Sequence, residues 1–165
     1  MPTLEHPQFI LDTLNMSIAD FIGKYFPGID VYTNPMQQDY DSPCFYINYI
    51  GDQDNKEQID DTSTQNLNLE ITYEEPHNIP NLFDKYREVA QTINDNIEHN
   101  LTYNLRDPDN INTIIKEIPL HVHDKRMACD LNAMHYKFKL SLRLRAIKEE
   151  VDKIEKIKWE ISAKN

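Results

Sequence analysis

The sequence predicts an α+β fold in which an antiparallel or mixed β-sheet packs against two amphipathic helices. Three observations indicate this class: two segments with apolar residues at helical spacing, several segments in which apolar and polar residues alternate, and an order along the chain that lets consecutive strands pair as hairpins. A chain of 165 residues can bury one core. We expect a single domain over residues 1–147 and a C-terminal extension over residues 148–165.

The first helix is expected within residues 7–26, where Leu14, Ile18 and Tyr25 share one face and Asp12 and Asp20 lie opposite. Pro27-Gly28 should end it. A short strand over residues 29–32 and a proline-containing loop over 34–43 follow. The β-branched and aromatic run CFYINYIG, at residues 44–51, predicts a strand that is buried on both faces or nearly so.

A projecting hairpin loop is expected over residues 52–64, because this stretch is polar apart from Ile59 and is too long for a tight turn. The following segment, QNLNLEITYEE, alternates and predicts a strand with an acidic face that carries Glu70 and Glu74. The charged residues expected on the projecting loop are Asp52, Asp54, Lys56, Glu57, Asp60 and Asp61.

The second helix is expected within residues 78–101, with Asn81 as its N-cap. A turn should follow at residues 106–110. Residues 113–124 read as a strand that is broken near Pro119, and residues 125–133 as a connection or a short hairpin arm.

The stretch AMHYKFKLSLRLRA, at residues 133–146, alternates almost perfectly and predicts a strand with one apolar and one basic face. Residues 1–130 hold 8 Lys or Arg and 23 Asp or Glu, a formal charge of −15, whereas residues 131–165 hold 9 and 5, a charge of +4. This balance disfavours a general nucleic-acid binder and favours association between unlike patches. The cations of the basic face are Lys137, Lys139, Arg143 and Arg145.

No sequence motif supports an enzyme or a cofactor, and we expect neither. His121 and His123, followed by Asp124, could bind a metal if Cys129 or His135 supplied a third ligand, but two surface histidines are the simpler interpretation. The acidic loop at 52–64 lacks the glycine and the terminal glutamate of a calcium-binding EF-hand. No signal peptide and no membrane-length apolar run is evident, and two cysteines favour a reducing, intracellular setting.

Trp159 lies in a charged segment whose periodicity fits either a helix or a strand. Two interpretations stay open for this residue: a tail residue folded back on the core, or an anchor that inserts into a neighbouring subunit.

Taken together, the segments FIGKYFPGIDVYTNPMQQDYDSPCFYINYI, LNLEITYEE, LFDKYREVAQTINDNIE and HYKFKLSLRLR resemble the tail terminator, or tail-completion, proteins of long-tailed bacteriophages. The resemblance covers about residues 7–147, and the loop at 52–64 and the segment after Ile147 depart from it. It implies a structural virion protein without catalytic residues. Such proteins form a six-membered ring that caps the tail tube, ends its polymerisation and joins it to the neck connector.

The resemblance therefore implies a homo-oligomer, partners in the tube and neck proteins, genomic DNA that passes through the channel, and no membrane. It also implies assembly in the host cytoplasm and a place at the head-proximal end of the virion tail. Other head–tail joining proteins and a monomeric acidic binding module remain alternatives. The basic face could meet the Glu70 and Glu74 side of the next subunit, or pair with that strand within one sheet.

Overall fold

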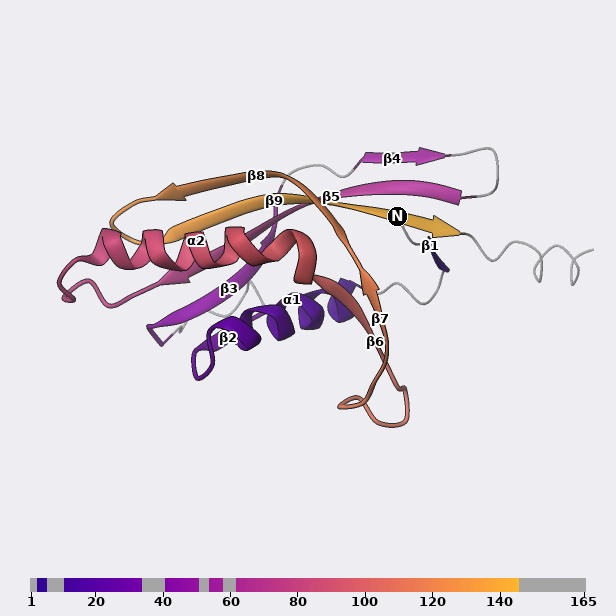
Figure 1. Ribbon diagram of the computed structural model, residues 1–165, viewed down its shortest axis with the longest axis horizontal. Helices are drawn as coiled ribbons and strands as arrows, with labels where there is room; N and C mark the ends of the chain where they lie inside the picture. The colour runs from indigo at the N-terminus through magenta and orange to yellow at the C-terminus, as the bar shows by residue number, and fades with distance from the viewer. Residues whose placement is uncertain (1–2, 6–10, 34–40, 51–53, 58–61, 146–165) are drawn as a thin grey trace, which may run out of the picture.

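The computed structural model describes residues 3–5, 11–33, 41–50, 54–57 and 62–145 (Figure 1). Two helices and two sheets are present in this part of the chain, which confirms the predicted α+β class. In chain order the elements are β1 (Thr3–Glu5), α1 (Leu11–Tyr25), β2 (Asp30–Tyr32), β3 (Cys44–Tyr49), β4 (Asp54–Glu57), β5 (Thr62–Glu74), α2 (Leu82–Asn100), β6 (Thr102–Arg106), β7 (Ile114–Pro119), β8 (His121–Cys129) and β9 (Met134–Arg145).

The main sheet is mixed and is built around the antiparallel pair β5 and β9. Their register runs from Thr62 opposite Arg145 to Tyr73 opposite Met134. On the outer side of β9 lie β8, antiparallel, and β1, parallel. On the outer side of β5 lie β3 and β4, both antiparallel, and β2 extends the sheet in parallel beyond β3.

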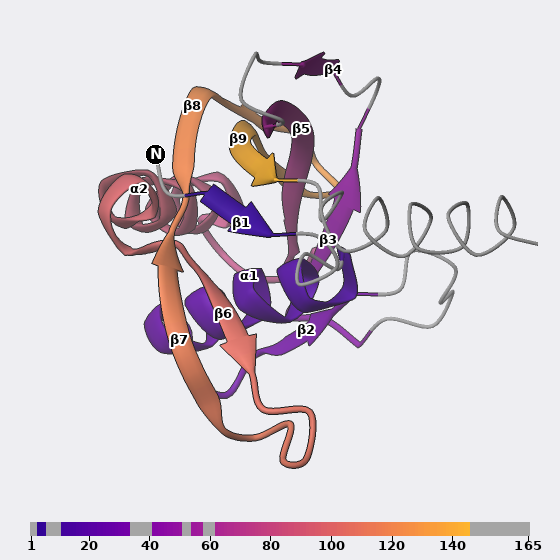
Figure 2. The same ribbon diagram turned by 90° about the vertical axis from the view of Figure 1, so that its right-hand side faces the viewer.

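Both helices cover the same face of this sheet (Figures 1 and 2). Alternation places the apolar residues of β5 and β9 on that face, where they form one core with the apolar stripes of α1 and α2. The predicted helix faces are confirmed, since the buried apolar residues of the two helices are Leu14, Ile18, Phe21, Ile22, Tyr86, Val89, Ala90, Ile93 and Ile97. The opposite face of the sheet carries polar side chains, and neither α1 nor α2 covers it.

The end of α1 and the start of α2 lie where the sequence predicted them. The first helix ends at Tyr25, two residues before Pro27, and Gly28 takes a positive φ of 81° that suits glycine. Asn81 occupies the N-cap position of α2, but its side chain makes no capping hydrogen bond. The predicted N-cap position is therefore confirmed, but the left-handed conformation of Asn81 (φ 58°, ψ 43°) differs from the extended one in which N-cap side chains usually accept a hydrogen bond.

The described parts of the stretch at 52–64 form strands, where the sequence predicted a projecting loop. Asp54, Lys56 and Glu57 lie on β4, whose backbone pairs with the start of β5, and β5 itself begins at Thr62. Strand pairing provides partners for backbone N–H and C=O groups that would bind water in a loop. The polar composition of this stretch gave no signal of the pairing. Asp52, Asp60 and Asp61 lie outside the described residues, as do the extension after Arg145 and Trp159.

The predicted strand at 113–124 divides between two sheets at Leu120. Its first part, β7, pairs with β6 in a separate two-stranded hairpin, whereas its second part, β8, joins the main sheet beside β9. Residues 125–133 form a hairpin arm, because β8 continues to Cys129 and a turn then leads into β9. The strands β1 and β6 were not expected from the sequence.

Candidate functional site

The polar face of the main sheet is the first candidate surface. On β9, Lys137 and Lys139 are exposed while Tyr136, Phe138 and Leu140 between and beside them are buried, which confirms the predicted strand faces. Arg143 shares this parity and is partly buried, whereas the side chain of Arg145 is outside the described set. These cations form a basic strip along β9. The strip lies on the polar face of the main sheet, which we call the open face.

The first acidic neighbours of the open face belong to the same subunit. Glu70 lies opposite Lys137 in the strand register. Its carboxylate Oε1 lies 2.7 Å from His135 Nδ1 and accepts a hydrogen bond from Thr72 Oγ1 at 2.7 Å. On the other side of β9, Lys139 Nζ lies 3.3 Å from Asp124 Oδ2. Pairing within the sheet, one of the two arrangements left open by the sequence, is therefore present.

Asp124 was not singled out as a partner of the basic strand, because it lies on a different strand. It sits at an irregularity between His123 and Arg126, where the pairing of β8 with β9 shifts register, and it has a positive φ of 51°. The hydrogen bond from Lys139 holds the pKa of Asp124 below its usual range. Both side chains are largely exposed, so this pair contributes little to stability.

Glu74 lies apart from the basic strip, because β9 begins opposite Tyr73 and Glu74 is one residue beyond it. The Tyr46 hydroxyl donates to Glu74 Oε1 at 3.1 Å, and burial, reinforced by this carboxylate, raises the pKa of Tyr46. Burial and, to a smaller extent, Glu74 also raise the pKa of Cys44 to about 11. Both groups therefore stay protonated at neutral pH, and Cys44 is not an activated thiol.

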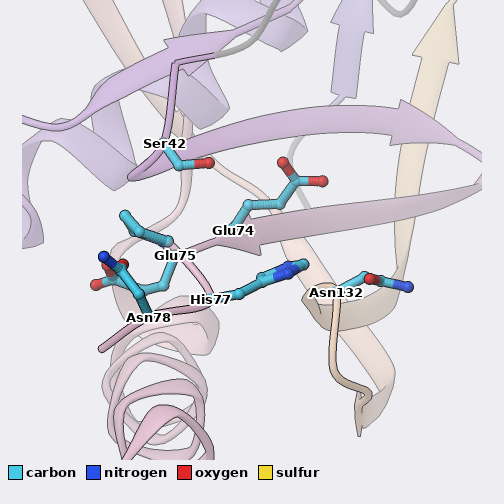
Figure 3. A pocket seen from close by; sticks show the side chains of 7 residues that line it. Ser42, Glu74, Glu75, His77, Asn78 and Asn132 are labelled. Atoms are coloured by element: carbon cyan, nitrogen blue, oxygen red, sulfur yellow. The ribbon is translucent and has the colours of Figure 1, made fainter. Parts of the chain in front are cut away.

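A pocket of about 630 Å³ lies beside Glu74, with Glu75, His77 and Asn132 on its walls (Figure 3). Its two carboxylates belong to successive residues and point apart: Glu74 accepts from Tyr46 on one side of the strand, and Glu75 accepts from the core residue Tyr73 on the other. They do not form a carboxylate couple suited to general acid–base chemistry.

The histidines considered as metal ligands take part in separate contacts. The rings of His121 and His123 stack at 5.4 Å, and His123 Nε2 lies 2.7 Å from Ser141 Oγ. His135 is held between Glu70 and Asp130, and Cys129 is exposed at the end of β8. Across the described residues, no three His, Cys, Asp or Glu side chains come together in a way that would hold a metal ion.

The β6–β7 hairpin is a second candidate surface, and it extends beyond the core on the helix side (Figures 1 and 2). Its base is fixed to α1 by a polar network. The backbone N–H of Asn104 donates to Ser17 Oγ at 2.9 Å, and its side-chain amide donates to Asp20 Oδ2 at 3.0 Å. The Arg106 guanidinium pairs with the same carboxylate and also donates to the carbonyl of Ile111 at 2.9 Å. This hairpin is therefore a braced arm.

Sequence reasoning missed this arm, although a signal for it was present. The segment TYNLR alternates directly before the turn RDPDN, and an apolar run follows that turn, which is the pattern of a hairpin. The strand signal of this hairpin is weak, because most residues of β7 are exposed and therefore do not alternate between apolar and polar.

The fold and its surfaces define a small α+β domain with one helix-covered sheet face, one open polar face and a braced hairpin arm. A family model described as phage tail terminator protein matches residues 13–152, which is most of the chain. The chain therefore belongs to the phage tail terminator family, and the predicted resemblance is confirmed. Comparison with curated proteins gives no match.

Membership of this family identifies a component of the phage tail that interacts with other tail components. The family is not known for catalysis. Neither described helix has the length and apolar character needed to cross a membrane.

Proposed function

We propose that the protein forms a ring, most simply of six copies, that caps the head-proximal end of the tail tube, ends tube polymerisation and joins the tail to the neck. The match to the terminator family over residues 13–152 carries this proposal. The protein acts as a structural element with no enzymatic activity, and assembly takes place in the host cytoplasm. Genomic DNA passes through the channel of the ring without being bound tightly.

The charge distribution supports a ring. A cyclic assembly needs a heterologous interface, in which two different patches of one subunit meet in successive copies. The basic strip of β9 and the acidic remainder of the chain supply unlike patches. The acidic balance also suits a channel for DNA, because each Lys or Arg contact to a phosphate strengthens binding and would slow passage.

We propose the open face as an assembly surface, with Lys137, Lys139 and Arg143 as its basic contacts. Glu70 then acts indirectly, because it holds His135 beside these cations. Glu74 lies apart from them, beyond the first residue of β9, and remains a proposed contact from the sequence. Arg145, which follows on the same strand, and Trp159, as an anchor in the extension, remain proposed contacts from the sequence. The charged loop around β4 remains a proposed contact as well.

Charge reversal tests the open face. The variant Lys139→Glu should bind its assembly partner about tenfold more weakly, because a like charge then faces the acidic partner. It should keep its fold, since the Lys139–Asp124 pair is exposed. The matched control is Lys24→Glu, which reverses an exposed lysine on α1 away from the sheet. Capping of tail tubes that is unchanged in Lys139→Glu, or equally impaired in Lys24→Glu, would contradict the assignment.

The ring itself is tested by the mass of the purified full-length protein, alone and after incubation with tail tubes. The chain has a mass of 19.5 kDa, so six copies amount to about 117 kDa. Light scattering should find this species in solution, or electron microscopy should find it on tube ends. A monomer under both conditions would favour the acidic binding module instead.

A further inference from the structure

The outermost line of α2 carries a regular row of acidic side chains. Positions 84, 88, 91, 95 and 98 follow one another at steps of four or three residues, so they lie along one side of the helix. This side points away from the core, because the buried residues of α2 occupy the opposite side. Gln91 is the uncharged member of the row, and its amide donates to Asp95 Oδ1 at 2.7 Å. The four carboxylates, which are all exposed and which we call the acidic stripe, are those of Asp84, Glu88, Asp95 and Glu98.

Most of the acidic stripe has no cationic partner within the described part of the subunit. At one end of the stripe, Lys125 Nζ lies 3.0 Å from Glu98 Oε1. The other three carboxylates take part in none of the ion pairs between described residues. The lysine and the arginine of the same helix, Lys85 and Arg87, lie to either side of the row. Because like charges three or four residues apart on a helix repel each other, the stripe favours a cationic partner.

The basic strip of the open face has the opposite charge and a similar lack of partners. Arg126 extends the strip onto β8, because it lies directly opposite Lys137 and shares its face. Neither of these two side chains forms an ion pair with a described residue. Glu70 lies on the other side of Lys137, but its Oε1 is already bound by His135 and Thr72. Two like charges opposite each other on paired strands repel, so the strip favours an anionic partner.

The acidic stripe and the basic strip are similar in length. Asp84 and Glu98 are 14 positions apart, which is about 21 Å along a helix that rises about 1.5 Å per residue. Lys137 and Arg143 are 6 positions apart, which is about 20 Å along a strand that rises about 3.3 Å per residue. A helix laid on a sheet face is the packing that this fold already uses on its covered side. The outer side of α2 can therefore lie along β9 of another copy, with acidic residues over basic ones.

The two surfaces lie on opposite sides of the same subunit. The Tyr136 hydroxyl donates to Asn94 Oδ1 at 2.8 Å, which places α2 on the side of β9 opposite to Lys137 (Figure 1). The core lies between the two surfaces, so a copy cannot bring its own stripe onto its own strip. It can offer the stripe to one neighbour and the strip to another, which is a heterologous arrangement.

We propose that the acidic stripe of one copy packs on the basic strip of the next, with the carboxylates of α2 facing Arg126, Lys137 and Lys139. Head-to-tail contacts of this kind generate a ring when the rotation between successive copies closes. This inference rests on the proposed ring and names the two surfaces that build it. Because the contact is largely electrostatic, it weakens as salt is added.

Charge reversal on each surface of the full-length protein tests the contact. Glu88→Lys/Asp95→Lys makes the stripe basic, and Lys137→Glu/Lys139→Glu makes the strip acidic. Both double variants should stay folded, because all four side chains are exposed. The ring population of each, counted by light scattering in solution and by electron microscopy on tube ends, should fall about tenfold or more. A mixture of the two variants should restore rings of alternating copies, because each stripe then meets a strip of opposite charge.

The matched control is Asp12→Lys/Asp109→Lys. It changes the net charge by the same amount as the stripe variant, at exposed positions outside both surfaces. Its ring population should equal that of the parent protein. Rings lost equally in this control, or a mixture of the two reversed variants that forms no rings, would overturn the proposal.

Salt provides a second test, which needs no substitution. The screening length falls from about 10 Å at about 0.1 M NaCl to about 3 Å at about 1 M, so the parent rings should be about tenfold fewer at the higher concentration. A ring population that does not change with salt would overturn the proposal. Full ring formation and tube capping by both reversed variants would reject this contact while leaving the terminator role intact. A parent protein that neither forms rings nor caps tubes would reject the terminator role itself, and this contact with it.

Discussion

Replacing Phe138 with Asp is expected to unfold the protein. Phe138 is 2% exposed and lies in the centre of β9, between the helices and the sheet. An aspartate there would lose the apolar contacts of the ring and bury an unpaired charge, at a cost of about 5 kcal/mol or more. Because single domains have free energies of unfolding of about 5–15 kcal/mol, most of the stability should be lost. Circular dichroism and urea denaturation measure this loss.

The matched control for this substitution is Lys137→Asp. Lys137 is the adjacent residue on β9, but it lies on the open face and is exposed. The same new side chain should therefore leave the protein folded, with a change in the free energy of unfolding below about 1 kcal/mol. If Phe138→Asp stays folded while Lys137→Asp unfolds, the assignment of the two sheet faces is inverted.

Replacing Asp20 with Ala is expected to loosen the hairpin arm and to destabilise the domain by about 1–3 kcal/mol. The substitution removes the common acceptor of the Asn104 amide and the Arg106 guanidinium. The Arg106 side chain is 14% exposed, so water can replace the lost acceptor only in part. Thermal unfolding and amide hydrogen exchange of β6 should report the loss of stability and of local order, respectively.

The control for the arm is Asp12→Ala on the same helix. Asp12 is exposed in the first turn of α1 and affects the helix mainly through its dipole, at about 0.3–1 kcal/mol. Faster exchange of β6 in Asp20→Ala, with unchanged exchange in Asp12→Ala, is the expected pair of results. Equal protection of β6 in both variants would show that the polar network does not brace the arm.

The sequence predicted the parts of this fold that depend on strong local periodicity. The buried faces of both helices and of β9 follow from apolar spacing, and the helix end at Pro27-Gly28 follows from turn chemistry. The burial of apolar side chains determines these elements, and the spacing of apolar residues along the sequence indicates which side chains are buried. The same periodicity separated Phe138 from Lys137, which places the open face correctly.

The missed elements depend on contacts between distant segments. The strand β1 forms because Thr3–Glu5 meets Arg143–Arg145, and β4 forms because a polar stretch folds back on the start of β5. The partner of Lys139 is Asp124, which the irregularity in β8 presents to β9. The brace of the arm joins α1 to β6 through side chains more than 80 positions apart in the chain. Local patterns contain no signal for such pairings.

The hairpin arm and the open face differ in the kind of contact that they can make. The β6–β7 hairpin exposes the apolar side chains of Ile111 and Ile115, and the basic strip on the open face is the proposed electrostatic contact to an acidic partner. Apolar burial contributes most of the affinity of such assemblies, whereas charge complementarity contributes orientation and specificity. Both surfaces stand on elements fixed by the core, so the ring contacts should be formed largely before assembly.

Tube growth in the presence of the purified protein tests the central claim most directly. Tail-tube subunits are polymerised with and without the full-length chain, and tube lengths and tube ends are measured by electron microscopy. The terminator role predicts that tubes stop growing when the protein is added and that a ring sits at one end of each tube. Tubes that continue to lengthen, with no density added at their ends, would contradict it.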